Sequence, residues 1–227
     1  MPGWELVGEE EKLAALAVFD SSPPWQFFTN RQLVREFEQA FAASLGVPDA
    51  IAVSSGTAAL KCALKALGVK RGDEVITQAH TFVATVEAIV DCGADPVIVD
   101  VDDSLNMDIK ALARKVTCRT KVILPVHMLG GACDMSEIAK LGKRFGFKII
   151  EDASHAIGGQ YKGEPVGNCA FSDICIFSFH PVKIITTGEG GMAMTQNAQL
   201  ASRMRLLRSH GITRDPSEME NASEGGW

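Results

Sequence analysis

A single lysine lies in a long uncharged stretch in the second half of the sequence. The segment FSFHPVKIITTGEGG (177–191) places Lys183 after an apolar run and before a run of threonines and glycines. From Ile174 to Gly188 no other residue carries a charge, apart from His180. A lysine in such a pocket can have a lowered pKa, which favours the neutral amine that Schiff-base chemistry needs. Ser178, five residues earlier, is placed to donate a hydrogen bond to a phosphate.

Two further motifs could act together with this lysine. IIEDASHA (149–156) places Asp152 at the end of an apolar run, with His155 three residues later. SSGTAAL (54–60) places Gly56 and Thr57 in a turn before a helical pattern, where free backbone N–H groups favour a phosphate. Taken singly, the turn can be a simple helix cap, Asp152 a loop cap and His155 an ordinary histidine with its own partners.

Pyridoxal 5′-phosphate (PLP) needs this combination of groups. Its phosphate needs an anchor, its pyridine nitrogen needs a carboxylate that keeps it protonated, and its aldehyde needs a lysine. Phe82, in the segment AHTFVAT, is the candidate for the aromatic ring that stacks on the pyridine face, although core packing would also explain a phenylalanine there. The sequence therefore predicts a PLP site with Lys183 as its catalytic residue.

The elements that must position these residues alternate regularly. Apolar strands are expected at Ala50–Val53, Glu74–Thr77, Pro96–Val101, Lys121–Val126, Phe147–Asp152, Ile174–Phe179 and Gly191–Thr195. Helical patterns fall before or between most of them, at Leu33–Phe41, Ala58–Leu67, Phe82–Asp91 and Met107–Lys115, after a cap at Asp134, and at Ala198–Ser209. This alternation predicts an α/β fold with a mainly parallel sheet between helices, which binds ligands at the carboxyl ends of its strands. The link between the last two strands has no helix, so we expect a functional loop there.

Composition narrows the class of protein. The 227 residues are 46% hydrophobic and carry a net charge of −6, without the basic stripe of a nucleic-acid binder. No apolar run reaches the ~18–20 residues of a membrane span, and the N-terminus is acidic where a secretory signal would be basic. The six cysteines have no CxxC spacing, so we expect reduced thiols and no metal site. A cytoplasmic protein without nucleic-acid or membrane partners is expected.

The motifs SSGTAAL, HTFVAT, EDASHAIGG and FSFHPVKIITTGEGG together resemble the DegT/DnrJ/EryC1/StrS family of sugar aminotransferases, from about Thr29 to Asp215. The resemblance implies the fold type I of PLP-dependent transferases and a homodimer. It implies that the enzyme moves an amino group from glutamate, leaving 2-oxoglutarate, to a nucleotide-linked 4-keto-6-deoxy sugar. The segments HPVKIITTGEGGMA and RSHGITRDP are most similar to sequences of the branch that aminates C4 of a UDP-linked keto-sugar on the way to pseudaminic acid.

The resemblance also assigns roles. Lys183 would bind the cofactor covalently and later move a proton between the substrate and the cofactor. Asp152 would pair with the pyridine nitrogen and His155 would lie by the phenolic oxygen. The remaining roles are phosphate binding by Ser178, Gly56 and Thr57, ring stacking by Phe82, and sugar-nucleotide binding by Phe28 and Thr29.

Domain organisation follows from the same resemblance. Residues 1–227 are expected to form the PLP-binding large domain, with an N-terminal segment 1–48 and an α/β core 49–211, and the family's C-terminal small domain is expected to be absent. The family usually has Gly-Pro shortly after the N-terminal threonine, where this sequence reads TNRQ (29–32). That difference obscures the substrate loop.

Two other functions remain open from the sequence. Another fold type I enzyme, such as a lyase acting on sulfur amino acids, shares the aspartate and the lysine but usually not SFHPVK. A non-catalytic regulatory or binding homologue could keep the same fold. One branch of the family replaces the lysine with histidine and dehydrates sugars, and Lys183 argues against that branch.

Overall fold

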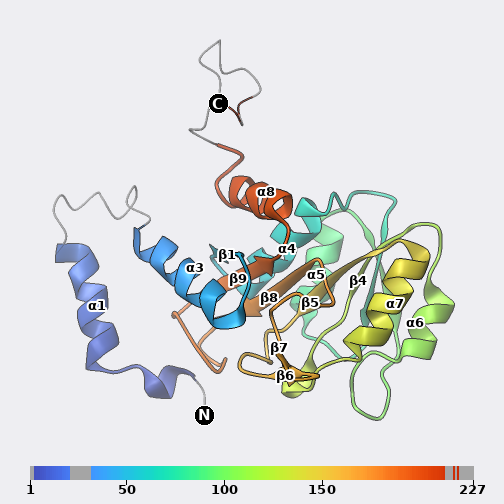
Figure 1. The fold of residues 1–227 in the computed structure, drawn as a ribbon, viewed down its shortest axis with the longest axis horizontal. Coiled ribbons are helices and arrows are strands. Elements are labelled where there is room, and N and C mark those ends of the chain that lie inside the picture. Colours follow the sequence, from blue (N-terminus) through green and yellow to red (C-terminus); the bar gives the residue numbers. More distant parts are fainter. Residues whose placement is uncertain (1–2, 21–31, 213–216, 218, 220–227) are drawn as a thin grey trace.

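The computed structural model describes residues 3–20, 32–212, 217 and 219. A seven-stranded sheet forms its centre, in the order β1-β9-β8-β5-β4-β2-β3 (Figure 1). The strands are β1 (Asp49–Val53), β2 (Glu74–Gln78), β3 (Asp95–Val99), β4 (Thr120–Leu124), β5 (Lys148–Asp152), β8 (Ile174–Ser178) and β9 (Gly191–Thr195). β9 is antiparallel to both of its neighbours, and the other paired strands are parallel. The mainly parallel α/β fold is thus confirmed.

Helices cover both faces of this sheet. α4 (Gly56–Ala66), α5 (Val83–Asp91) and α8 (Ala198–Arg208) pack on one face, and α3 (Gln32–Leu45), α6 (Ile109–Lys115) and α7 (Met135–Phe145) on the other (Figure 1). The strand residues alternate accordingly: Ile150 belongs to the core under α4 and α5, whereas Ile149 belongs to the core under α6 and α7. Successive residues of β5 therefore face opposite sides of the sheet.

Local signals set the helix boundaries. Asp134 caps α7 by accepting a hydrogen bond from the Glu137 N–H at 3.3 Å, and Gly146 ends it in the left-handed region. Two helices begin two residues away from the start that the hydrophobic pattern suggested. α6 begins at Ile109 rather than Met107, because the Asp108 carboxylate caps the helix at Lys110 and Ala111. α4 begins at Gly56 rather than Ala58, because Ser55 is its cap.

Several short elements have no counterpart in the sequence analysis. β6 (Gln160–Tyr161) and β7 (Glu164–Pro165) form a separate hairpin, and η2 (Met128–Gly130) is a 3₁₀ turn. η1 (Gly3–Leu6) and α1 (Glu9–Asp20) lie to one side of the layered body in Figure 1. Residues 13–19 of α1 (LAALAVF) are an unbroken apolar run, so the helix lacks the periodic stripe by which a packed helix is recognised. Its large apolar side chains are exposed: Leu13, Leu16 and Phe19. No helix within the described ranges is both long and apolar enough to span a bilayer.

Candidate active site

The carboxyl ends of β2, β5 and β8 open at the same edge of the sheet. Because these strands are parallel through β4, the segments that follow them lie on one side of the molecule. The segment after β2 carries Phe82, β5 ends at Asp152, and the link after β8 carries Lys183. β1 runs in the same direction, since β9 is antiparallel to both β1 and β8, and it delivers the N-terminus of α4 to this edge.

The N-terminus of α4 touches the end of β8. A Cβ atom on Gly56 would lie 2.7 Å from Ser178 Cβ and 3.1 Å from its hydroxyl oxygen, so only glycine permits this approach. Ser55 caps the helix by accepting the Ala58 N–H at 3.1 Å. The N–H groups of Gly56 and Thr57 belong to the first turn, where a helix has no internal acceptors. The arrangement gathers hydroxyl and N–H donors at a positive helix end, as phosphate binding requires.

The Asp152 carboxylate is held in one orientation by hydrogen bonds. Thr85, on α5, donates its hydroxyl to Oδ2 at 3.1 Å, and Ser154 donates its N–H and hydroxyl to Oδ1 at 3.1 and 2.6 Å. Asp152 is only 5% exposed, so these donors compensate for its loss of water. Sequence reasoning missed Thr85 and Ser154. Ser154 was within reach as a residue two positions after the acid, whereas Thr85 is 67 positions away.

Lys183 is half-buried on the link between β8 and β9. Burial lowers the pKa of its amine, and the negative charge of Asp152 opposes that shift. The lysine and the carboxylate therefore lie within electrostatic reach of each other. A lysine whose pKa is lowered by burial has a larger neutral fraction than a solvated one, which is the direction that the sequence analysis expects.

Two histidines have buried ring nitrogens that face this region. His155 has its pKa lowered by burial and, secondarily, by the positive charge of Lys183. Among the described residues, neither the Nδ1 atom of His155 nor that of His80 has a hydrogen-bond partner. Buried polar atoms without partners are rare and indicate a missing ligand or water. Sequence reasoning missed His80, although it lies two residues before Phe82 in the same AHTFVAT motif.

Phe82 is 69% exposed, so core packing does not explain it. It immediately precedes α5, at the rim of the same strand edge, where its ring is free to stack on a flat ligand. The predicted sugar-nucleotide residues Phe28 and Thr29 lie outside the described residues, so their placement stays a prediction.

The residues at this strand edge have free hydrogen-bonding groups and charges that fit PLP. Glycine at position 56 lets the first turn of α4 lie against Ser178, and the Nδ1 atoms of His80 and His155 have no hydrogen-bond partner among the described residues. An acid with fixed orientation and a lysine of lowered pKa complete the set. Phosphate, ring and aldehyde would each meet a suitable group.

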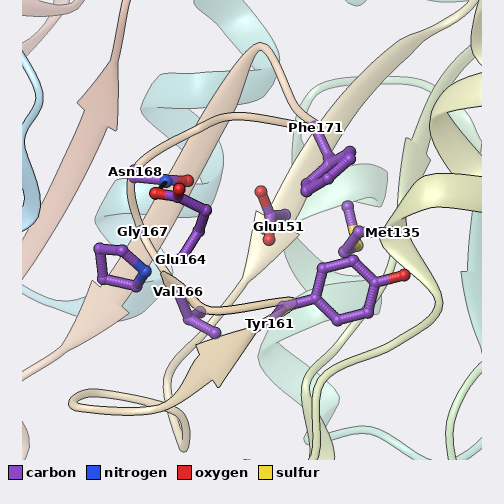
Figure 2. Close-up of a pocket in the computed structure, with 9 residues that line it drawn as sticks. Met135, Glu151, Tyr161, Glu164, Val166, Gly167, Asn168 and Phe171 are labelled. Atoms are coloured by element: carbon purple, nitrogen blue, oxygen red, sulfur yellow. Dashed lines mark hydrogen bonds between the residues drawn. The ribbon is translucent and has the colours of Figure 1, made fainter.

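A small hollow lies on the opposite face of the sheet. It is lined by residues of α7, β5 and the β6–β7 region, among them Met135, Glu151, Tyr161 and Phe171, and Figure 2 shows their side chains around it. Glu151 precedes Asp152 on β5 and so points away from the candidate site. Its carboxylate accepts hydrogen bonds from His127 Nε2 at 2.8 Å and from the Ser172 hydroxyl. This second carboxylate is fully engaged in protein contacts.

Comparison with known proteins identifies the family. A model of the DegT/DnrJ/EryC1/StrS aminotransferase family matches residues 7–225. The GDP-perosamine synthase of Caulobacter vibrioides is 46% identical over 187 residues, which are 82% of this chain and 49% of that protein. The UDP-4-amino-4-deoxy-L-arabinose–oxoglutarate aminotransferase of Shewanella sediminis is 44% identical over 186 residues, 82% of this chain and 47% of that protein.

Solved structures give the same result. Helicobacter pylori PseC, an aminotransferase of pseudaminic acid biosynthesis, superimposes with a TM-score of 0.81 at 33% identity over 92% of this chain and 56% of that one. A Streptococcus pneumoniae protein, described as a sugar aminotransferase in its PLP form, gives 0.80 at 31% identity over 92% of this chain and 57% of that one. The chain spans about half the length of the curated relatives it matches. The match of the family model over most of its residues shows that this chain belongs to the DegT/DnrJ/EryC1/StrS aminotransferase family.

Proposed function

We propose that the protein is a PLP-dependent aminotransferase that transfers an amino group from glutamate to a nucleotide-linked 4-keto-6-deoxy sugar. The observation that carries the proposal is the pairing of Lys183, whose pKa is lowered by burial, with the hydrogen-bonded carboxylate of Asp152 at the same strand edge. A structural lysine has no need of a buried acid fixed by Thr85 and Ser154. A PLP enzyme needs both groups, in that relation.

Each residue of the site has a role in this proposal. When bound, PLP supplies a ring that accepts the electrons of the carbon atom that gains or loses the amino group. Asp152 would hold a proton at the pyridine nitrogen, and Lys183 would bind the cofactor and then move a proton to and from the reacting carbon. His155 would lie by the phenolic oxygen, and Phe82 would shield one face of the ring from water.

The phosphate is assigned to the α4 end of the site. Ser178 and the turn Gly56–Thr57 supply the donors, and the partial positive charge of the helix N-terminus favours a dianion. Because Gly56 has no side chain, the Ser178 hydroxyl can lie against the first turn of α4, where one phosphate could accept hydrogen bonds from both.

The substrates are assigned by class. Two relatives carry names of nucleotide-sugar enzymes with different nucleotides, GDP and UDP, and one name includes oxoglutarate, the product expected from a glutamate donor. These names support a nucleotide-linked sugar and glutamate for this protein. PseC, from pseudaminic acid biosynthesis, is 33% identical to this chain, whereas the GDP-perosamine synthase is 46% identical. We therefore propose a class of sugar and not one particular sugar.

We also propose a homodimer. The apolar side chains of α1 that point into solvent are the kind that a second copy would cover: Leu13, Leu16 and Phe19. Light scattering of the complete protein tests this, and a monomer at micromolar concentration would contradict it.

The experiment for the function uses absorbance. The complete protein is loaded with PLP, and its absorbance in the visible region is followed when glutamate and then a UDP- or GDP-linked 4-keto sugar are added. An aminotransferase loses the visible band with glutamate and regains it with the keto-sugar. A lyase would release its product without a keto-sugar requirement, and a non-catalytic homologue would leave the band unchanged; either result would refute the proposal.

A further inference from the structure

The turn η1 meets the lysine-bearing link at one point. The Gly3 N–H donates a hydrogen bond to the Lys183 carbonyl oxygen at 2.6 Å. Gly3 is the buried residue of η1, whereas most other described residues of η1 and α1 are exposed. A backbone contact therefore joins two segments that are 180 positions apart at the very residue proposed to bind the cofactor.

Position 3 has no room for a side chain. A Cβ atom there would lie 2.8 Å from the Lys183 carbonyl oxygen and 2.9 Å from the Thr186 backbone nitrogen. Both neighbours are backbone atoms, so neither can swing aside as a side chain would. Gly8 offers a contrast in the same segment, since a Cβ there would meet only the Glu11 carboxylate, at 3.7 Å.

The link itself has few other anchors. The Lys183 N–H donates to the His180 carbonyl at 2.9 Å, which is a bond within the link. Within the described part of the chain, the Gly3 bond is the only hydrogen bond that joins residues 181–186 to a segment outside the β8–β9 hairpin. Apolar packing does not replace it, because the apolar side chains of the link are about half exposed: Val182, Ile184 and Ile185.

We propose that Gly3 is a positioning residue for Lys183, and that η1 holds the peptide of the lysine in place through its backbone N–H. This inference rests on the proposed role of Lys183. A side-chain amine four carbons from its Cα reaches a defined point only when the backbone that carries it is fixed. Removing the anchor would let the link relax into solvent and move the amine away from Asp152.

Two variants of the complete protein test the inference by different physical routes. In Gly3→Ala, the added methyl group clashes with the backbone of the link and displaces η1. A variant lacking residues 1–7 removes the hydrogen bond without adding an atom. Gly8→Ala is the matched control, because it makes the same chemical change where a Cβ fits. The readouts are the equilibrium affinity for PLP, the pH midpoint of the absorbance change of bound PLP, and hydrogen exchange of the amides of residues 181–187.

We expect both test variants to bind PLP about fivefold more weakly, as the loss of one hydrogen bond predicts. We also expect a shifted pH midpoint and faster exchange in the link, with Gly8→Ala equal to the unaltered protein. If PLP attaches to Lys183 in the unaltered protein and both test variants behave the same as it does, the inference is wrong while the proposed function stands. If only Gly3→Ala shows the effect, the hydrogen bond is not the cause and the inference fails. If the unaltered protein does not attach PLP to Lys183, the proposed function itself fails.

Discussion

Two consecutive carboxylates on β5 have opposite surroundings. Glu151 and Asp152 are equally buried, each 5% exposed, but they face opposite sides of the sheet. Glu151 accepts hydrogen bonds from His127 and Ser172, and the Cys133 N–H donates to the remaining ring nitrogen of His127 at 3.2 Å. Every polar group in that chain of contacts has a protein partner.

Asp152 lies beside groups whose hydrogen bonding is incomplete. Its own carboxylate is held by Thr85 and Ser154, but nearby imidazole atoms of His80 and His155 have no partner within the described residues. Lys183 is within electrostatic reach and keeps part of its surface exposed. Equal burial thus accompanies a saturated network on one face and an unsaturated one on the other. We infer that unmet hydrogen-bonding capacity in its surroundings, rather than burial, distinguishes Asp152, the proposed functional acid, from Glu151.

The largest expected effect comes from removing the lysine. Lys183→Ala should abolish covalent attachment of PLP and reduce turnover to background, because no other amine faces the site in the proposed assignment. Absorbance of the PLP-loaded protein and an aminotransfer assay measure both effects. Lys140→Ala, which removes a surface lysine paired with Glu137, is the control and should change neither. Substantial turnover in Lys183→Ala would contradict a catalytic role for the face of the sheet that carries Asp152 and Lys183.

The two carboxylates should respond differently to mutation. Asp152→Asn should leave the fold intact and allow PLP to bind, but lower turnover by about three orders of magnitude, because the ring nitrogen loses its charged partner. Glu151→Ala should instead lower the free energy of unfolding by about 3–5 kcal/mol, the usual cost of breaking a buried charged network. Turnover per folded molecule and urea unfolding of both variants give the comparison directly. Equal loss of turnover in both would show that the two faces are not functionally distinct.

A smaller effect is expected from the donor that orients Asp152. Thr85→Val removes the hydroxyl that donates to Oδ2 and should lower turnover about tenfold, since a hydrogen bond to a charged group contributes about 1.5–3 kcal/mol. Thr77→Val is its match on β2, because the buried Thr77 hydroxyl donates to the Leu124 carbonyl and touches no site residue. Thr77→Val should lose stability but keep turnover. The reverse pattern would remove Thr85 from the site.

The smallest effect concerns pH. Only the neutral amine attacks the PLP aldehyde, so attachment should accelerate as pH rises through the pKa of Lys183, which burial lowers. The Asp152 charge raises that pKa, so Asp152→Asn should move the midpoint of attachment to lower pH by about one unit. Stopped-flow absorbance of the cofactor-free protein measures it, with Asp134→Asn as a surface control. A midpoint that moves upward would contradict the electrostatic pairing of the two residues.

The sequence predicted the layered fold well because each strand of the seven-stranded sheet contains an apolar run and most helices carry a helical period. The apolar runs of β5 and β8 are recognisable alone, and the capping residue Asp134 identifies α7. α1 was missed because its apolar residues form no stripe, and the β6–β7 hairpin because strands of two residues carry no period. Local signals were sufficient wherever burial of one face imposed a repeat.

The candidate site was predictable only where its groups stand in recognisable motifs. Lys183, Asp152 and the Gly56–Thr57 turn each follow an apolar run, so their positions at strand ends could be read directly. The contact of Thr85 with Asp152 and that of Gly3 with Lys183 could not, because both join residues far apart in sequence through a single hydrogen bond. Such contacts depend on how the helices, strands and loops pack together. The amino-acid sequence alone contains no local pattern that would predict them.

The central claim is that Lys183 binds the cofactor. The complete protein is incubated with PLP, reduced with borohydride to make the cofactor–lysine bond permanent, digested, and analysed by mass spectrometry. The account predicts one modified peptide, which contains Lys183, and the loss of that modification in Lys183→Ala. Stoichiometric modification of another lysine, or no modification of a folded protein that retains turnover, would contradict it.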